Sequence, residues 1–304
     1  MAPSASPSFV ARGVFPALLT PFADDGERID AGALRAHVAW LIDRGVHGLM
    51  PAGSTGEGPL LTLAERQQLL EIVLDAAAGR VPILAHVGAI TTRETIALVR
   101  HAQACGAQAA SIVTPYYFRV PDEALIAHAC RVAEAAPELP IFLYNIPQNT
   151  GNALSPAVVE AIVARCPNVV GLKDSSDDLD ALVRFTATCG GRLQVLCGSD
   201  RLLCDALQAG ACGSVSGNAN LFPEIVVGIF ESFARGDLAG ARAYQEQLDR
   251  AREALGDGRY LSLYKRVLER RGLRGGSVRP PLPEAPAALV EAAVARLREH
   301  HLLT

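Results

Sequence analysis

The sequence alternates short apolar runs with longer amphipathic stretches over its first 235 residues. Eight of the runs are rich in Val, Ile and Leu, and their apolar character is continuous rather than interrupted at every second position: Val14–Thr20, Gly48–Gly53, Val81–Val87, Ala110–Pro115, Ile141–Ile146, Val169–Lys173, Leu193–Gly198 and Gly213–Gly217. Continuous apolar runs are typical of parallel strands that are covered on both faces. The pattern therefore predicts eight parallel strands.

The stretches between these runs carry the spacing and the end signals of α-helices. They are Ala31–Arg44, Leu63–Ala78, Thr92–Cys105, Asp122–Ala136, Ser155–Arg165, Asp178–Cys189, Arg201–Ala209 and Phe222–Ala234. Thr62 and Glu65 form a capping-box pattern, and Pro156 stands at a first helical position. Gly follows several of the stretches directly, as it does at helix C-caps.

Eight strand–helix units in about 230 residues predict a (β/α)8 barrel, the TIM-barrel fold. The alternative is a doubly wound open sheet, which usually carries a Gly-rich fingerprint after its first strand. No such fingerprint follows the first run, which continues into Pro21–Gly26. We therefore predict a catalytic barrel over residues 1–235 and a C-terminal helical segment over residues 236–304. That segment is expected to form about three helices, which are separated at Gly256–Gly258 and at Pro280–Pro286.

Composition excludes several classes of protein. The chain has 28 Lys and Arg against 32 Asp and Glu, and this mildly acidic balance argues against a nucleic-acid partner. It lacks the apolar stretch of about 18 residues that crosses a membrane, and its N-terminus does not resemble a signal peptide. Seven cysteines without Cys-x-x-Cys spacing indicate small buried side chains in a reducing compartment, so we expect a cytoplasmic protein. The seven histidines show no ligand spacing, and no metal site is expected.

Lys173 stands out among the residues that end the apolar runs, where barrel enzymes carry their functional groups. Only two of the 28 basic residues are lysines, and the other is Lys265, outside the predicted barrel. A lysine at the end of a buried strand suggests a nucleophile that forms a Schiff base, a role that needs a neutral amine. The alternative is an ion pair with the neighbouring Asp174 at the rim of the barrel.

Two further features favour the catalytic interpretation. Tyr144 lies near the end of the preceding run, and its hydroxyl could relay protons, although a core tyrosine is the simpler alternative. Ser54 and Thr55 lie between two glycines and could bind a small carboxylate, or they could belong to an ordinary loop. A 2-keto acid such as pyruvate fits the whole set. Its ketone would condense with Lys173, and the enamine that follows would add to an aldehyde, or the reverse.

The motifs that contain these residues resemble the dihydrodipicolinate synthase / N-acetylneuraminate lyase family of class I aldolases. They are Gly53–Glu57, Thr114–Tyr117, Tyr144–Pro147 and Gly171–Asp174. The resemblance implies a (β/α)8 barrel with a helical C-terminal part, assembled as a homotetramer, a dimer of dimers. It also implies that Lys173 is the Schiff-base lysine, that Tyr144 relays protons and that Ser54 and Thr55 hold the pyruvyl carboxylate. No separate cofactor is implied.

Other residues are assigned by the same resemblance. Tyr117 matches a tyrosine that reaches into the neighbouring subunit's site, and Gly198 and Val215 match positions that line the pyruvate pocket. Asn149 stands where the synthases carry an arginine for the carboxylate of the aldehyde, and Asn cannot form that bidentate charged pair.

This departure shapes the expected reaction. We expect an aldolase or lyase of the 4-hydroxy-2-oxoglutarate or 2-keto-3-deoxy sugar-acid type. The alternatives within the family are 4-hydroxy-tetrahydrodipicolinate synthase, a sugar-acid dehydratase and a sialic acid lyase. Outside it, the alternatives are a metal-dependent aldolase and a non-catalytic barrel that binds a small acid.

Overall fold

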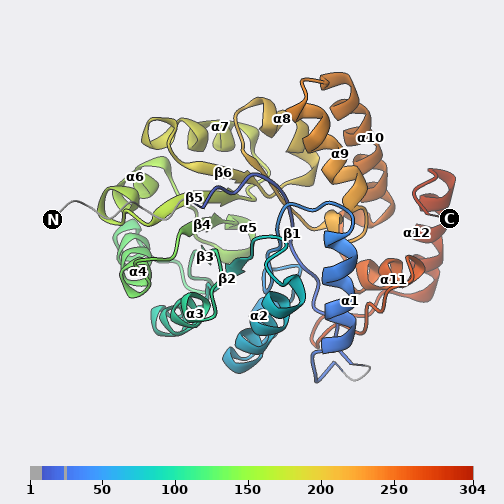
Figure 1. The fold of residues 1–304 in the computed structure, drawn as a ribbon, viewed down its shortest axis with the longest axis horizontal. Helices are drawn as coiled ribbons and strands as arrows, with labels where there is room; N and C mark the ends of the chain where they lie inside the picture. The colour runs from blue at the N-terminus through green and yellow to red at the C-terminus, as the bar shows by residue number, and fades with distance from the viewer. Residues whose placement is uncertain (1–8, 24–25, 304) are drawn as a thin grey trace. The chain divides into compact units, whose positions relative to one another are not determined.

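The computed structural model describes residues 9–23 and 26–303 (Figure 1). The first eight residues, in which we predict no signal peptide, lie outside this part, as do residues 24, 25 and 304. The chain forms two compact units. The first contains Met1–Arg12 and Pro82–Val215, and the second contains Gly13–Val81 and Ser216–Thr304.

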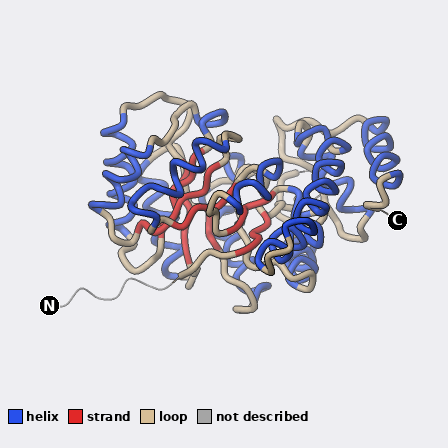
Figure 2. The backbone as a smooth tube through the Cα atoms, turned by 90° about the horizontal axis from the view of Figure 1, so that it is seen from above, coloured by secondary structure: helices blue, strands red, loops and turns tan. Residues whose placement is uncertain are grey.

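A parallel sheet forms the centre of the first unit. Its strands follow the order β7-β6-β5-β4-β3-β2, and each neighbouring pair is parallel, as predicted. The strands are β2 (Leu84–His86), β3 (Ala109–Val113), β4 (Ile141–Asn145), β5 (Val169–Asp174), β6 (Gln194–Cys197) and β7 (Gly213–Ser216). Five of the helices that connect them lie outside the sheet (Figures 1 and 2): α3 (Thr92–Ala104), α4 (Asp122–Ala135), α6 (Pro156–Arg165), α7 (Leu179–Ala187) and α8 (Leu203–Gln208). The short helix α5 (Pro147–Thr150) follows the end of β4 directly.

The two faces of this sheet differ in what they contact. Leu143 of β4 lines a small cavity together with Leu125 of α4 and Ile162 of α6, so its side chain points toward the helices. Successive side chains of a strand point to opposite faces. Tyr144, the next residue of β4, therefore points away from this helical layer, and so does Lys173, its Cα partner on β5.

The second unit contains β1 (Gly13–Pro16), the first two α-helices of the chain and the last four. Its helices are α1 (Ala31–Ile42), α2 (Leu63–Ala77), α9 (Pro223–Ala234), α10 (Leu238–Ala254), α11 (Leu261–Arg270) and α12 (Ala287–Glu299). All eight helices predicted for the barrel are present within a few residues of their expected ends, and the Thr62–Glu65 capping box is formed. The three C-terminal helices are also confirmed. None of the described helices is both long enough and apolar enough to span a membrane.

The prediction of a strand at Gly48–Gly53 is wrong, and the described residues contain seven strands rather than eight. Met50 forms an isolated parallel bridge with Ala17, next to β1. The ladder stops there because Pro51 has no N–H to donate and because Ala52 adopts a left-handed backbone with φ 61°. The chain turns at this point instead of extending.

The predicted boundary between residues 235 and 236 falls between α9 and α10, inside the second unit. These two helices pack closely, since a Cβ atom on Gly228 would lie 2.7 Å from Cζ of Tyr244. The division into barrel and helical segment stays a prediction.

Two buried histidines make the fold sensitive to acid. Burial lowers the pKa of His37 and that of His128 to about 4 each. A histidine in the unfolded chain binds its proton near pH 6.5, whereas the buried one stays neutral down to about pH 4. The free energy of unfolding is therefore at its full value above pH 6.5 and decreases as the pH falls toward 4, because protons bind preferentially to the unfolded chain. The loss amounts to about 3 kcal/mol for each histidine. Denaturant titrations between pH 7 and pH 4.5 measure it. His37→Gln should reduce the pH dependence, and the same change at exposed His300 should not.

Candidate active site

Lys173 and Tyr144 form the centre of the candidate site in the first unit. They are Cα partners on β5 and β4, and the Lys173 Nζ atom lies 3.9 Å from the centroid of the Tyr144 ring. Lys173 is 4% exposed and Tyr144 is 2% exposed. A lysine is rarely buried to this degree without a specific role.

The alternative ion pair between Lys173 and Asp174 is not formed. The Asp174 carboxylate accepts hydrogen bonds from Nδ2 of Asn145 and from Oγ of Ser176, both at 2.7 Å. Burial raises the pKa of this carboxyl, and the two hydrogen bonds counteract that effect. Within residues 9–23 and 26–303, no carboxylate lies within ion-pair distance of Lys173. Asp174 instead links the ends of β4 and β5 and so holds Tyr144 and Lys173 in register.

Gly198 leaves the space that the Lys173 side chain occupies. A Cβ atom at this position would lie 1.9 Å from Oγ of Ser175 and 3.0 Å from Cε of Lys173. The Gly198 N–H donates to the carbonyl oxygen of Asp174 at 2.6 Å, which holds the two segments close together. Any larger residue would therefore have to displace the Ser175 hydroxyl group, and its Cβ would press against the Asp174 carbonyl oxygen and the lysine side chain.

We expect Gly198→Ala to lower activity by about 10- to 100-fold, because a shift of about 1 Å in a reacting group has an effect of this size. Steady-state rates, together with circular dichroism and a melting curve, separate this loss from unfolding. Gly32→Ala in α1 is the matched control, since its Cβ would meet only Oδ1 of Asp30, at 3.5 Å. Full activity in Gly198→Ala would show that the lysine does not need this space.

His86, one of the seven histidines, lies beside Tyr144 and was not predicted as a site residue. Their ring centroids are 5.8 Å apart and the rings are nearly perpendicular. The signal for this position was a polar residue near the end of an apolar run. On the next layer of the same face, the Phe142 ring fills the space that a Cβ on Gly171 would need. The Phe142 ring thus packs directly below the layer that contains the lysine and the tyrosine.

Three other predicted site residues lie in the first unit. Val215 is buried in β7, and Asn149 is exposed in α5. Tyr117 is 84% exposed, adopts φ 78° and packs edge-on against the exposed Phe118 ring, with the centroids 5.0 Å apart. Tyr117 therefore projects from the surface of its unit.

Ser54 and Thr55 belong to the second unit, in the turn that follows Met50. Ser54 is exposed, and its carbonyl oxygen accepts a hydrogen bond from the Glu57 N–H at 3.1 Å. Thr55 is half-buried and faces Gly217, where a Cβ would lie 3.5 Å from the threonine Oγ1 atom. The turn presents two hydroxyl groups, which are able to donate to an anion.

A buried amine without a carboxylate partner among the described residues, next to a phenol ring, is suited to Schiff-base chemistry. A family model, described as the dihydrodipicolinate synthetase family, matches residues 10–298. A 4-hydroxy-tetrahydrodipicolinate synthase from Methanopyrus kandleri is 39% identical over 277 residues, which cover 91% of this chain and 92% of that protein.

Solved structures show the same similarity. One is YagE from Escherichia coli K12, a prophage protein of the dihydrodipicolinic acid synthase family, in complex with pyruvate. It is 31% identical with a TM-score of 0.91, covering 96% of this chain and 99% of that one. Another is a catalytic-lysine mutant of the Ruminococcus gnavus sialic acid aldolase, 26% identical with a TM-score of 0.90, covering 95% and 96%.

These findings define the protein as an enzyme, a lyase of the class I aldolase type. The chain belongs to the dihydrodipicolinate synthetase family, and the resemblance predicted from its motifs is confirmed.

Proposed function

We propose that the protein is a pyruvate-dependent aldolase that forms a Schiff base on Lys173 and makes or cleaves a carbon–carbon bond of a 2-keto acid. The observation that carries this proposal is the buried Lys173 amine, which has only the Tyr144 ring against it among the described partners. Family membership supports it, because a pyruvate complex is known for a relative of similar fold.

The proposed chemistry runs through the lysine amine. Its nitrogen attacks the ketone carbon, the carbinolamine loses water, and the resulting iminium acidifies the adjacent methyl group. Loss of that proton gives an enamine, whose carbon attacks an aldehyde, and water then releases the product. Tyr144 relays the protons, and Ser54 and Thr55 bind the carboxylate. The iminium is itself the electron sink, so the reaction as proposed needs no separate cofactor and no metal ion.

The proposed substrates are of the 4-hydroxy-2-oxoglutarate or 2-keto-3-deoxy sugar-acid type. Asn149 supports this choice, because an exposed amide in α5 does not offer the bidentate charged pair that binds a second carboxylate. The name of the Methanopyrus kandleri relative favours a second candidate, 4-hydroxy-tetrahydrodipicolinate synthase. A dehydratase would use the same Schiff base without cleaving a carbon–carbon bond.

The fold and the assembly of the subunits are proposed from family membership and from two exposed aromatic side chains. We propose a closed (β/α)8 barrel in a cytoplasmic homotetramer, in which a neighbouring subunit covers Tyr117 and Phe118. The exposure of these adjacent aromatic side chains supports a contact there, since large apolar surfaces on soluble proteins often mark interfaces. Sedimentation of the full chain tests the tetramer.

A screen of 4-hydroxy-2-keto acids tests the function, with pyruvate release as the readout. Release of pyruvate together with an aldehyde is the expected result. Formation of a dehydrated keto acid without pyruvate would identify a dehydratase. Condensation of pyruvate with aspartate semialdehyde at a higher kcat/KM than any cleavage would identify the synthase.

A further inference from the structure

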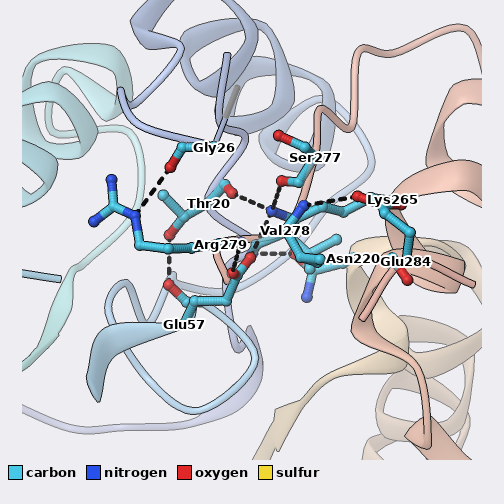
Figure 3. Close-up of polar contacts among 12 residues, drawn as sticks. Thr20, Gly26, Glu57, Asn220, Lys265, Ser277, Val278, Arg279 and Glu284 are labelled. Atoms are coloured by element: carbon cyan, nitrogen blue, oxygen red, sulfur yellow. Dashed lines mark hydrogen bonds and ion pairs between the residues drawn. The ribbon is translucent and has the colours of Figure 1, made fainter. Parts of the chain in front are cut away.

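A buried ion pair in the second unit anchors the turn that contains Ser54 and Thr55. Lys265 of α11 and Glu57 both have fully buried side chains, and the lysine Nζ atom lies 2.5 Å from the glutamate Oε1 atom (Figure 3). Burying two charges costs free energy of desolvation, and this cost can exceed the attraction between them. A gain in stability therefore does not by itself explain the pair. Its position, directly after Ser54 and Thr55, points to a role in that turn.

The hydrogen bonds of the pair are consistent with its charged form. Lys265 Nζ also donates to the carbonyl oxygens of Thr20 and Ser277, each at 2.7 Å, in addition to its ion pair with Glu57. The second carboxylate oxygen of Glu57 accepts a hydrogen bond from the backbone N–H of Arg279 at 2.8 Å. Burial raises the pKa of Glu57 and lowers the pKa of Lys265, while the charge of each partner counteracts both changes.

The pair fixes the backbone of the turn. Glu57 adopts a left-handed conformation with φ 57°, which is uncommon for a residue other than glycine. Thr20, whose carbonyl binds the lysine, also donates through Oγ1 to the carbonyl oxygen of Gly56 at 2.7 Å. A Cβ on Gly56 would lie 2.6 Å from the Leu18 carbonyl oxygen, so the turn lies directly against this segment.

The C-terminal part of the chain completes the anchor. Ser277 pairs with Phe22 in an isolated antiparallel bridge, which places its carbonyl oxygen against the lysine. The Arg279 guanidinium forms a two-pronged pair with Glu65 at 2.7 and 2.8 Å. The turn at residues 53–57 is thus tied to α11 and to the segment that follows it, more than 200 residues further along the chain.

We propose that Glu57 and Lys265 are positioning residues that set the affinity of the Ser54–Thr55 turn for the carboxylate of the 2-keto acid. This inference rests on the proposed function. Neither side chain is accessible to a ligand, so each acts only through the backbone of the turn. Loss of the pair should weaken carboxylate binding without changing the reactivity of the Lys173 amine.

The double variant Glu57→Gln/Lys265→Met tests the proposal, because it removes both charges and leaves no unpaired buried charge. Borohydride trapping on Lys173 is measured with pyruvate and with acetone, a ketone that has no carboxylate. We expect the half-saturating concentration of pyruvate to rise by about tenfold or more at an unchanged maximal rate, since uniform binding is lost. The trapping rate with acetone should stay at the wild-type value.

A second variant, Thr20→Val, removes only the hydroxyl that donates to Gly56 and decides the matter if the double variant does not fold. It should show the same selective loss for pyruvate, of about threefold or more, because it leaves a buried carbonyl unsatisfied. Glu269→Gln, also on α11, is the matched control. It breaks an exposed ion pair with Arg266 at 3.0 Å and should change the trapping of neither pyruvate nor acetone.

The outcomes separate this inference from the proposed function. A folded variant that traps pyruvate with wild-type half-saturation would overturn the positioning role. Equal losses for pyruvate and acetone would overturn it too, because they would indicate general damage to the site. If the wild-type enzyme traps neither ketone, the Schiff-base function itself fails.

Discussion

Replacing Lys173 by alanine is expected to abolish covalent trapping of pyruvate and to lower turnover by at least about 10³-fold, more than about 4 kcal/mol of transition-state stabilisation. The reason is that the amine supplies the iminium, and no other buried amine is placed against Tyr144 among the described residues. The measurement is the mass of the protein after incubation with pyruvate and borohydride, followed by peptide mapping.

The composition of the chain makes this experiment easy to interpret. Lys265 is the only other lysine, and its amine is fully buried, donates to two carbonyl oxygens and pairs with Glu57. Lys173→Arg is the matched control, because it keeps the positive charge but cannot form an imine. An adduct that persists in either variant, or one that maps outside the Lys173 peptide, would contradict the assignment.

The pairing of Lys173 with Tyr144 could be predicted from the sequence. Both residues lie at or near the ends of continuous apolar runs that are one strand–helix unit apart, and parallel neighbouring strands bring such ends together. The helices could be predicted nearly to their ends, because capping residues and amphipathic spacing are local signals.

Features that depend on long-range contacts could not be predicted. The error at Gly48–Gly53 has a local cause instead, because Pro51 within the run and the left-handed Ala52 end the pairing. The Glu57–Lys265 pair joins residues far apart in the chain, and nothing local indicates it apart from the scarcity of lysine. The need for glycine at position 198 arises from Ser175 and Lys173 on the adjacent strand segment.

Removing only the Tyr144 hydroxyl should have the second largest effect. We expect Tyr144→Phe to lower kcat by about 10² to 10⁴-fold, the usual contribution of a positioned proton-transfer group. The ring itself is retained, so the surface that packs against the Lys173 amine at 3.9 Å is preserved. KM should change little, because the hydroxyl is proposed to act in proton transfer rather than in uniform binding.

Trapping kinetics distinguish a proton relay from a packing role. If the hydroxyl relays protons, adduct formation with pyruvate slows in Tyr144→Phe but reaches the wild-type level, because the amine is still in place. If the residue only supports Lys173, the phenylalanine ring suffices and kcat stays within about threefold of wild type, well short of the expected loss. Tyr244→Phe on α10 is the matched control, since it removes a phenol hydroxyl from a tyrosine that packs against Gly228 in the helical part of the second unit.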